Sequence, residues 1–94
     1  MNTIVCRLRV YKKILLLMQN INKAISKVII KNRQKHSLSQ EKLAELVGIH
    51  RTYVSQIERG LKSPTLQVLF KLSIAFNISA SKLIEEIEGE LNVI

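Results

Sequence analysis

A run of polar side chains in the middle of the chain has the types and the spacing that could read the edges of DNA bases. Arg51 can donate two hydrogen bonds to one guanine, and Gln56 can form a similar pair with adenine. Thr52 can offer its methyl group to thymine, or its hydroxyl to a base or a phosphate. In a helix, Val54 and Ile57 would turn inward and leave these three residues on the outer face. The run therefore predicts a base-reading surface.

Further polar residues could contact the DNA backbone or support the base contacts. Ser55 and Arg59 share the outer face, and Gln40 lies at the start of the preceding predicted helix. Backbone N–H groups and the positive end of the dipole make a helix N-terminus favourable for a phosphate. Each of these residues alone could be an ordinary exposed polar residue, but their presence together on one face favours DNA contact.

Two short helices are needed to position these side chains. Ser39 can cap the first helix, and Gly48 follows it where a left-handed C-cap would fall. Ala44 supplies the small side chain that a close helix crossing requires. The second helix is predicted from about residue 50 to 59, with Gly60 just past its end. Two short helices with a glycine at the bend between them have the geometry of a helix-turn-helix.

Three further helices are predicted around this pair. The first runs from Asn20 or Asn22 to about Lys35, because apolar residues recur there at helical spacing. Thr65 can cap a helix that ends near Phe76, and Ser79 can cap the last one. The predicted fold is an all-α, compact five-helix domain over residues 19–94, preceded by an N-terminal extension over residues 1–18.

Composition and charge indicate one domain that meets a polyanion. The chain has 94 residues, and 47% of them are hydrophobic, which is enough for one core but not for two. The formal net charge is +8, so nucleic acid is the first expected partner and an anionic membrane the second. No acidic residue precedes Glu41, whereas four glutamates lie between residues 85 and 90. This asymmetry predicts a basic face for nucleic acid and an acidic end that points away from it.

Several other kinds of chemistry are not expected. Cys6 is the only cysteine, and His36 and His50 have no ligand partners at metal spacing, so neither a disulfide nor a metal site is predicted. No nucleophile–base pair, paired carboxylates or phosphate loop can be assembled, so we expect no catalytic residues, no enzyme and no cofactor. The apolar run 14–18 is too short for a signal peptide or a membrane span, which predicts a soluble, cytoplasmic protein.

The first eighteen residues leave several alternatives open. They are basic and apolar, without a clear cap or turn. They could form a short strand from Ile4 to Tyr11, a helix, or an arm that packs on a partner subunit. Alternatively, Met18 could be the true start of the protein, because every recognisable feature follows it.

The central segment resembles the lambda-repressor/Cro type of helix-turn-helix, in the Xre-like family of bacterial and phage regulators. The resemblance covers Asn22 to Glu88 and implies a five-helix fold that binds operator DNA as a two-fold dimer. It also implies base contacts from Arg51, Thr52 and Gln56, and phosphate contacts from Gln40, Arg59 and Lys62. The matching residues are Arg33, Leu38-Ser39-Gln40, Leu43-Ala44, Gly48-Ile49, Val54-Ser55, Ile57-Glu58-Arg59-Gly60 and Ser63-Pro64-Thr65-Leu66.

The family resemblance further implies a structural ion pair between Arg33 and Glu58, which would fix the recognition helix against the first helix. A narrower similarity connects residues 50–60 with the controller proteins of restriction–modification systems. In that group Tyr53 would reach a phosphate or a base, although packing against the loop before Pro64 is an equal alternative. Asn32 departs from the family, which usually has an apolar residue there.

Useful sequence specificity requires two half-sites and therefore a homodimer. An apolar stripe near the C-terminus is the expected interface, with closure of the chain's own core as the alternative. The expected interface residues are Phe76, Ile78, Leu83, Ile84, Ile87 and Leu91. An antitoxin-type protein that binds a protein partner and regulates its own gene is an alternative function. A membrane-surface protein that uses the basic N-terminal segment is another.

Overall fold

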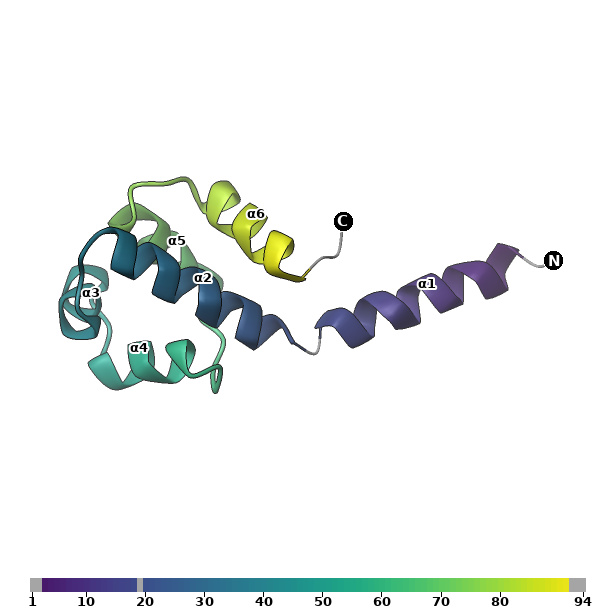
Figure 1. The fold of residues 1–94 in the computed structure, drawn as a ribbon, viewed down its shortest axis with the longest axis horizontal. Helices are drawn as coiled ribbons and strands as arrows, with labels where there is room; N and C mark the ends of the chain where they lie inside the picture. Colours follow the sequence, from purple (N-terminus) through teal and green to yellow (C-terminus); the bar gives the residue numbers. More distant parts are fainter. Residues whose placement is uncertain (1–2, 19, 92–94) are drawn as a thin grey trace.

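Helices account for most of the chain in the computed structural model, which describes residues 3–18 and 20–91. No strand occurs in these two ranges. The extension forms α1, and the five helices predicted for the domain follow it in order (Figure 1). Their bounds are α1 Thr3–Met18, α2 Ile21–Lys35, α3 Gln40–Val47, α4 Arg51–Glu58, α5 Leu66–Ala75 and α6 Ala80–Leu91.

The predicted caps define where the helices begin. The hydroxyl of Ser39 accepts the N–H of Lys42 at 3.0 Å, and the hydroxyl of Thr65 accepts the N–H of Val68 at 3.2 Å. Ser79 makes the equivalent bond ahead of α6. Each bond satisfies an N–H group that has no carbonyl partner in the first turn of a helix. The three predicted N-caps are therefore confirmed.

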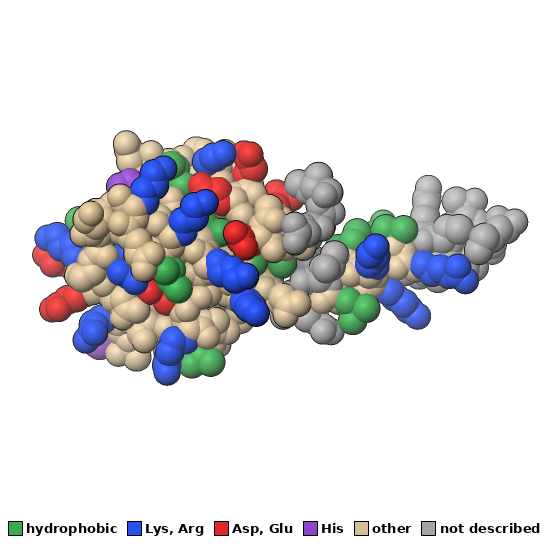
Figure 2. Space-filling model, in the orientation of Figure 1, with side chains coloured by type: hydrophobic (Ala, Val, Ile, Leu, Met, Phe, Trp, Pro, Cys, Tyr) green, Lys and Arg blue, Asp and Glu red, His purple; other side chains and the backbone are tan. Residues whose placement is uncertain are grey.

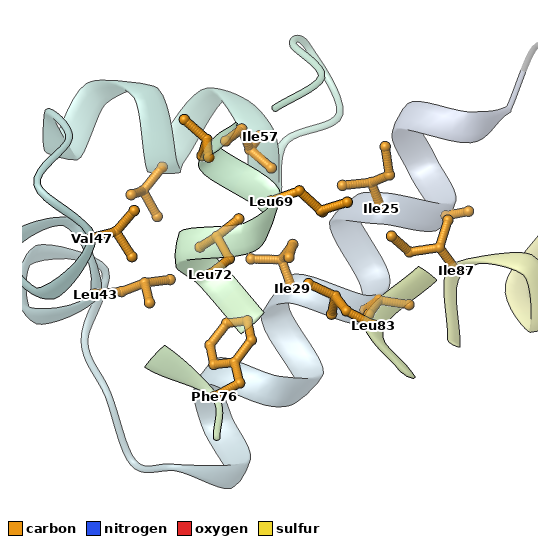
Figure 3. Close-up of a cluster of buried hydrophobic side chains, with 14 of the residues drawn as sticks. Ile25, Ile29, Leu43, Val47, Ile57, Leu69, Leu72, Phe76, Leu83 and Ile87 are labelled. Atoms are coloured by element: carbon orange, nitrogen blue, oxygen red, sulfur yellow. The ribbon is translucent and has the colours of Figure 1, made fainter. Parts of the chain in front are cut away.

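A bundle of α2 to α6 encloses a single apolar core (Figure 3). The central helix is α2, which packs against α6 and α4, while α3 packs against α4 and α5. The side chains at the centre are almost completely buried. They include Ile29, Leu43, Ile57, Leu72, Phe76 and Leu83.

Most side chains expected at a dimer interface instead lie inside a single copy. Residues spaced three or four apart along α6 form the inner stripe that closes the bundle against α2, so the alternative reading of this stripe describes the structure better. The buried residues are Phe76, Leu83, Ile87 and Leu91, and Ile78 is partly buried against the same core. Of the six expected residues, Ile84 is exposed, by 38%.

The extension is a helix rather than a strand, and it projects away from the bundle (Figure 1). The longest dimension of the molecule is 55 Å because of this projection. The apolar side chains Val10, Tyr11, Leu15 and Leu16 are exposed along it. None of the described helices is long and apolar enough to cross a membrane.

The two phenylalanines provide a matched test of the core. Phe76→Ala should lower the free energy of unfolding by about 3–5 kcal/mol, because the ring is fully buried and its loss leaves a cavity. Phe70→Ala changes the same residue type on α5, where the ring is 52% exposed, and should cost less than about 0.5 kcal/mol. Urea unfolding at low protein concentration would measure both. Equal losses for the two variants would contradict this core.

Candidate nucleic-acid interface

A tight turn sets the angle between α3 and α4. Gly48 has φ 75°, in the left-handed region, and its N–H donates to the carbonyl of Ala44 at 2.8 Å. His50 then caps α4, where its Nδ1 accepts the N–H of Thr52 at 3.4 Å. Val54 and Ile57 are each 1% exposed, so they fix the rotation of α4 about its own axis. The opposite face of α4 is consequently held outward.

Four of the predicted DNA-contacting residues surround one hollow between α3 and α4. Its volume is about 250 Å³, and we call it the α3–α4 hollow. Arg51 and Thr52 are exposed on its wall, and Ser55 and Gln40 are half-buried. Each of these side chains can donate a hydrogen bond to an oxygen atom placed there.

A second hollow lies between α4 and the loop that follows it. This loop-side groove has a volume of about 540 Å³. Thr52 lines both hollows, so the predicted base-contacting residues form one continuous surface around α4. The residues that line the groove are Asn22, His50, Thr52, Tyr53, Gln56, Leu61, Lys62 and Ser63. Among the predicted DNA contacts, Arg59 alone lines neither hollow, and it is exposed just after the end of α4.

Tyr53 is tied to the loop before α5. Its hydroxyl donates to the carbonyl of Ser63 at 3.3 Å and accepts the N–H of Thr65 at 3.3 Å. Asn22 and Ser63 are also hydrogen-bonded, which links the same loop to the first turn of α2. These bonds support the reading of Tyr53 as a residue that packs against the loop, although the ring also lines the loop-side groove.

Arg33 and Glu58 form a bidentate ion pair beneath α4. Arg33 Nε lies 2.6 Å from one carboxylate oxygen of Glu58, and Nη2 donates to the other at 3.0 Å. The Glu58 side chain is 4% exposed and that of Arg33 is 16% exposed. Arg33 Nη1 also donates to the carbonyl of Leu38 at 2.8 Å. The negative charge of Glu58 is therefore neutralised inside the protein and is not presented to DNA.

The structure adds two contacts that the sequence did not reveal. Gln40 Nε2 donates to Oε1 of Glu58 at 3.0 Å, so the proposed phosphate contact is bonded to the ion pair. Ser26, a small polar residue on the inner face of α2, donates from its hydroxyl to the backbone carbonyl of Glu58. The position of Ser26 among the buried apolar residues of α2 was the signal in the sequence that could have indicated a buried hydrogen bond. Both contacts join residues far apart in the chain, which helical spacing does not predict.

The family departure at Asn32 is accommodated in the core by hydrogen bonds. The side chain is buried, and its Nδ2 donates to the carbonyl of Val28 at 2.9 Å and to Glu86 at 3.0 Å. A buried amide with partners avoids most of the cost of desolvation. Asn32 thus joins α2 to α6 by a polar contact.

Basic side chains are distributed widely over the molecule. Figure 2 shows Lys and Arg on the visible face of the bundle, with acidic side chains among them, and further Lys and Arg along α1. The four glutamates at residues 85–90 all belong to α6. No group of three potential metal ligands comes together in residues 3–18 and 20–91.

Comparison with known proteins yields a family match and several relatives. The sequence pattern of a family described as helix-turn-helix, HTH_3, matches residues 29–83. Control protein C.SmaI from Serratia marcescens is 38% identical over 65 residues, which are 69% of this chain and 77% of that protein. Control protein C.MunI from a Mycoplasma species is 40% identical over 58 residues, or 62% of this chain and 78% of that protein.

A solved structure has the same arrangement of helices. The crystal structure of the clp gene regulator ClgR from Corynebacterium glutamicum matches with a TM-score of 0.72 and covers 78% of each chain. The sequences are 22% identical over that match, so the likeness concerns the fold.

Removing the carboxylate of Glu58 should affect stability more than sequence preference. Glu58→Ala leaves the Arg33 guanidinium without its partner in a largely buried site, which should cost about 3–5 kcal/mol of unfolding free energy. Glu45→Ala is the matched control, because its pair with Lys42 is exposed and 3.8 Å long, and should cost less than about 1 kcal/mol. Thermal melts and titrations with selected DNA would compare the two effects. A changed DNA preference with unchanged stability would refute this role.

Proposed function

The chain belongs to the HTH_3 family of helix-turn-helix DNA-binding regulators, and we propose that it binds a palindromic operator as a homodimer with α4 in the major groove. Base edges are contacted by Arg51, Thr52 and Gln56. The residues that contact phosphate or support the base contacts are Gln40, Tyr53, Ser55, Arg59 and Lys62. Such a regulator acts in the cytoplasm, where it meets DNA.

The outward face of α4 is the observation that carries this proposal. Val54 and Ile57 are buried to 1% exposure, and this commits the polar side of the helix to the surface. Recognition helices of this type read bases with residues near their N-terminus. Arg51 and Thr52 are the first two residues of α4, and both are exposed.

The proposed regulatory role is that of a restriction–modification controller. The chain is similar to control proteins C.SmaI and C.MunI, and it covers more than three quarters of each. The Arg-Thr-Tyr run at residues 51–53 supports the same subgroup. A controller would bind an operator close to the restriction and modification genes that it regulates.

A row of exposed apolar residues on α5 supports the homodimer. Leu66, Phe70 and Ile74 recur every four residues, so they lie along one side of the helix. They are 65%, 52% and 76% exposed. A two-fold interface uses the same patch on both copies, which allows this α5 row to be covered by its own equivalent. Two recognition helices held in this way would read half-sites about 34 Å apart.

Selection of bound sequences from random DNA, followed by the same selection with Arg51→Ala, would test direct readout. Loss of a bidentate contact to guanine should remove the preference at one position in each half-site and cost about 1–3 kcal/mol there. Lys62→Ala is the comparison, because a phosphate contact should weaken all sequences equally and reduce the salt slope by about 1. Uniform weakening by Arg51→Ala would show that it contacts phosphate instead.

Sedimentation velocity at micromolar concentration would test the α5 row. Ile74→Glu should weaken self-association by at least about tenfold, because a charge would enter an apolar interface. Leu46→Glu makes the same change at another exposed apolar position, on α3, and should leave the dimer intact. A monomeric wild-type protein, or equal effects of the two variants, would refute this interface.

A further inference from the structure

Among the residues that line the α3–α4 hollow, Gln40 also bonds to the buried ion pair. Its Nε2 donates to Oε1 of Glu58 at 3.0 Å, and the same oxygen accepts from Arg33 Nη2 at 3.0 Å. Gln40 begins α3, Glu58 ends α4 and Arg33 lies on α2. One carboxylate oxygen therefore joins three helices, and one of the attached side chains reaches the predicted DNA-facing surface.

The charge on Glu58 determines which way round the Gln40 amide lies. An ionised carboxylate only accepts hydrogen bonds, and the amide oxygen of glutamine also only accepts. A turned-over amide would place these two acceptors against each other, so the nitrogen must face Glu58. That nitrogen carries two N–H groups, and one of them is used within the described residues. The second N–H remains as a donor in an orientation that Glu58 sets.

We propose that Glu58 is a positioning residue for DNA binding, which holds Gln40 so that the second N–H of its amide donates to a phosphate oxygen in the α3–α4 hollow. This inference rests on the proposed function, because it assigns one contact within that DNA interface. Glu58 does not make the contact itself, since its side chain is 4% exposed and would repel a phosphate. Gln40 is neutral and half-buried, so it can bond to both anions at once.

Preorganisation is the physical advantage of this arrangement. A free glutamine side chain can adopt several rotamers and either amide orientation, and binding must then fix all of them. The bond to Glu58 fixes the amide before DNA arrives. The same carboxylate is fixed in turn by the bidentate contact with Arg33. Folding stability and the geometry of the phosphate contact thus depend on one group.

A double-mutant cycle on the full chain separates positioning from folding. DNA affinity would be measured for the wild type, Gln40→Ala, Glu58→Gln and the double variant, using the sequence selected by the wild type. Glu58→Gln keeps the shape of the side chain but allows either orientation of the Gln40 amide. It should weaken binding about three- to tenfold more in the presence of Gln40 than in the Gln40→Ala background. Urea unfolding of each variant would show that all are folded during the titration.

Ser55→Ala is the matched control for the cycle. Ser55 lines the same hollow, but its side chain has no hydrogen bond to Glu58 within the described residues. The losses caused by Ser55→Ala and Glu58→Gln should therefore multiply. Losses that also multiply for Gln40→Ala and Glu58→Gln would overturn the inference while leaving the proposed function intact.

DNA with single phosphates replaced by uncharged methylphosphonates gives a second readout that does not depend on altering Glu58. One replacement that weakens the wild type should have little effect on Gln40→Ala. If every replacement affects the two proteins equally, Gln40 binds no phosphate and the inference is wrong. If the wild type selects no DNA sequence at all, the proposed function fails and this inference fails with it.

Discussion

The ion pair between Arg33 and Glu58 constrains the orientation of the recognition helix more directly than any other polar contact described. It crosses from α2 to the end of α4, and its bidentate geometry restricts rotation as well as distance. Burying two charges is expensive, so the pair contributes little net stability compared with apolar residues of similar size. Its value lies in specificity of arrangement, since α4 in another orientation would leave Glu58 buried without a partner.

Apolar packing and the ion pair fix different degrees of freedom of α4. Val54 and Ile57 decide which face of the helix points outward, because both must remain in the core. Glu58 holds the C-terminal end of the helix against α2, and the hydrogen bond from Ser26 to its backbone carbonyl acts at the same place. The Gly48 turn determines where the N-terminal end lies relative to α3. Together these contacts position Arg51 and Thr52 without any contribution from those two side chains.

Local signals in the sequence were sufficient to predict the helices. They were not sufficient to predict which helix surfaces are buried in the core and which are exposed. Ser39, Thr65 and Gly48 act within a few residues of themselves, so their roles could be predicted from spacing alone. Apolar spacing, in contrast, shows that a helix has an apolar face but not what covers it. The stripe on α6 around Leu83 was therefore predicted as an interface and is core, whereas Phe70 on α5, where no interface was predicted, is exposed. The same limit applies to α1, because its sequence contains no clear cap or turn from which its helical form or its direction could be predicted.

The proposed interface combines neutral hydrogen-bond donors with charged groups, and both kinds of side chain line the hollows beside α4. Gln40, Thr52 and Ser55 are neutral, so hydrogen bonds from them to DNA would release few counterions and would persist as salt increases. Apart from Arg51, the lysines and arginines that give the chain its charge of +8 would supply an attraction that is independent of sequence and declines with salt. A network that fixes a neutral amide beforehand is useful for this reason, because it strengthens the part of binding that salt does not remove.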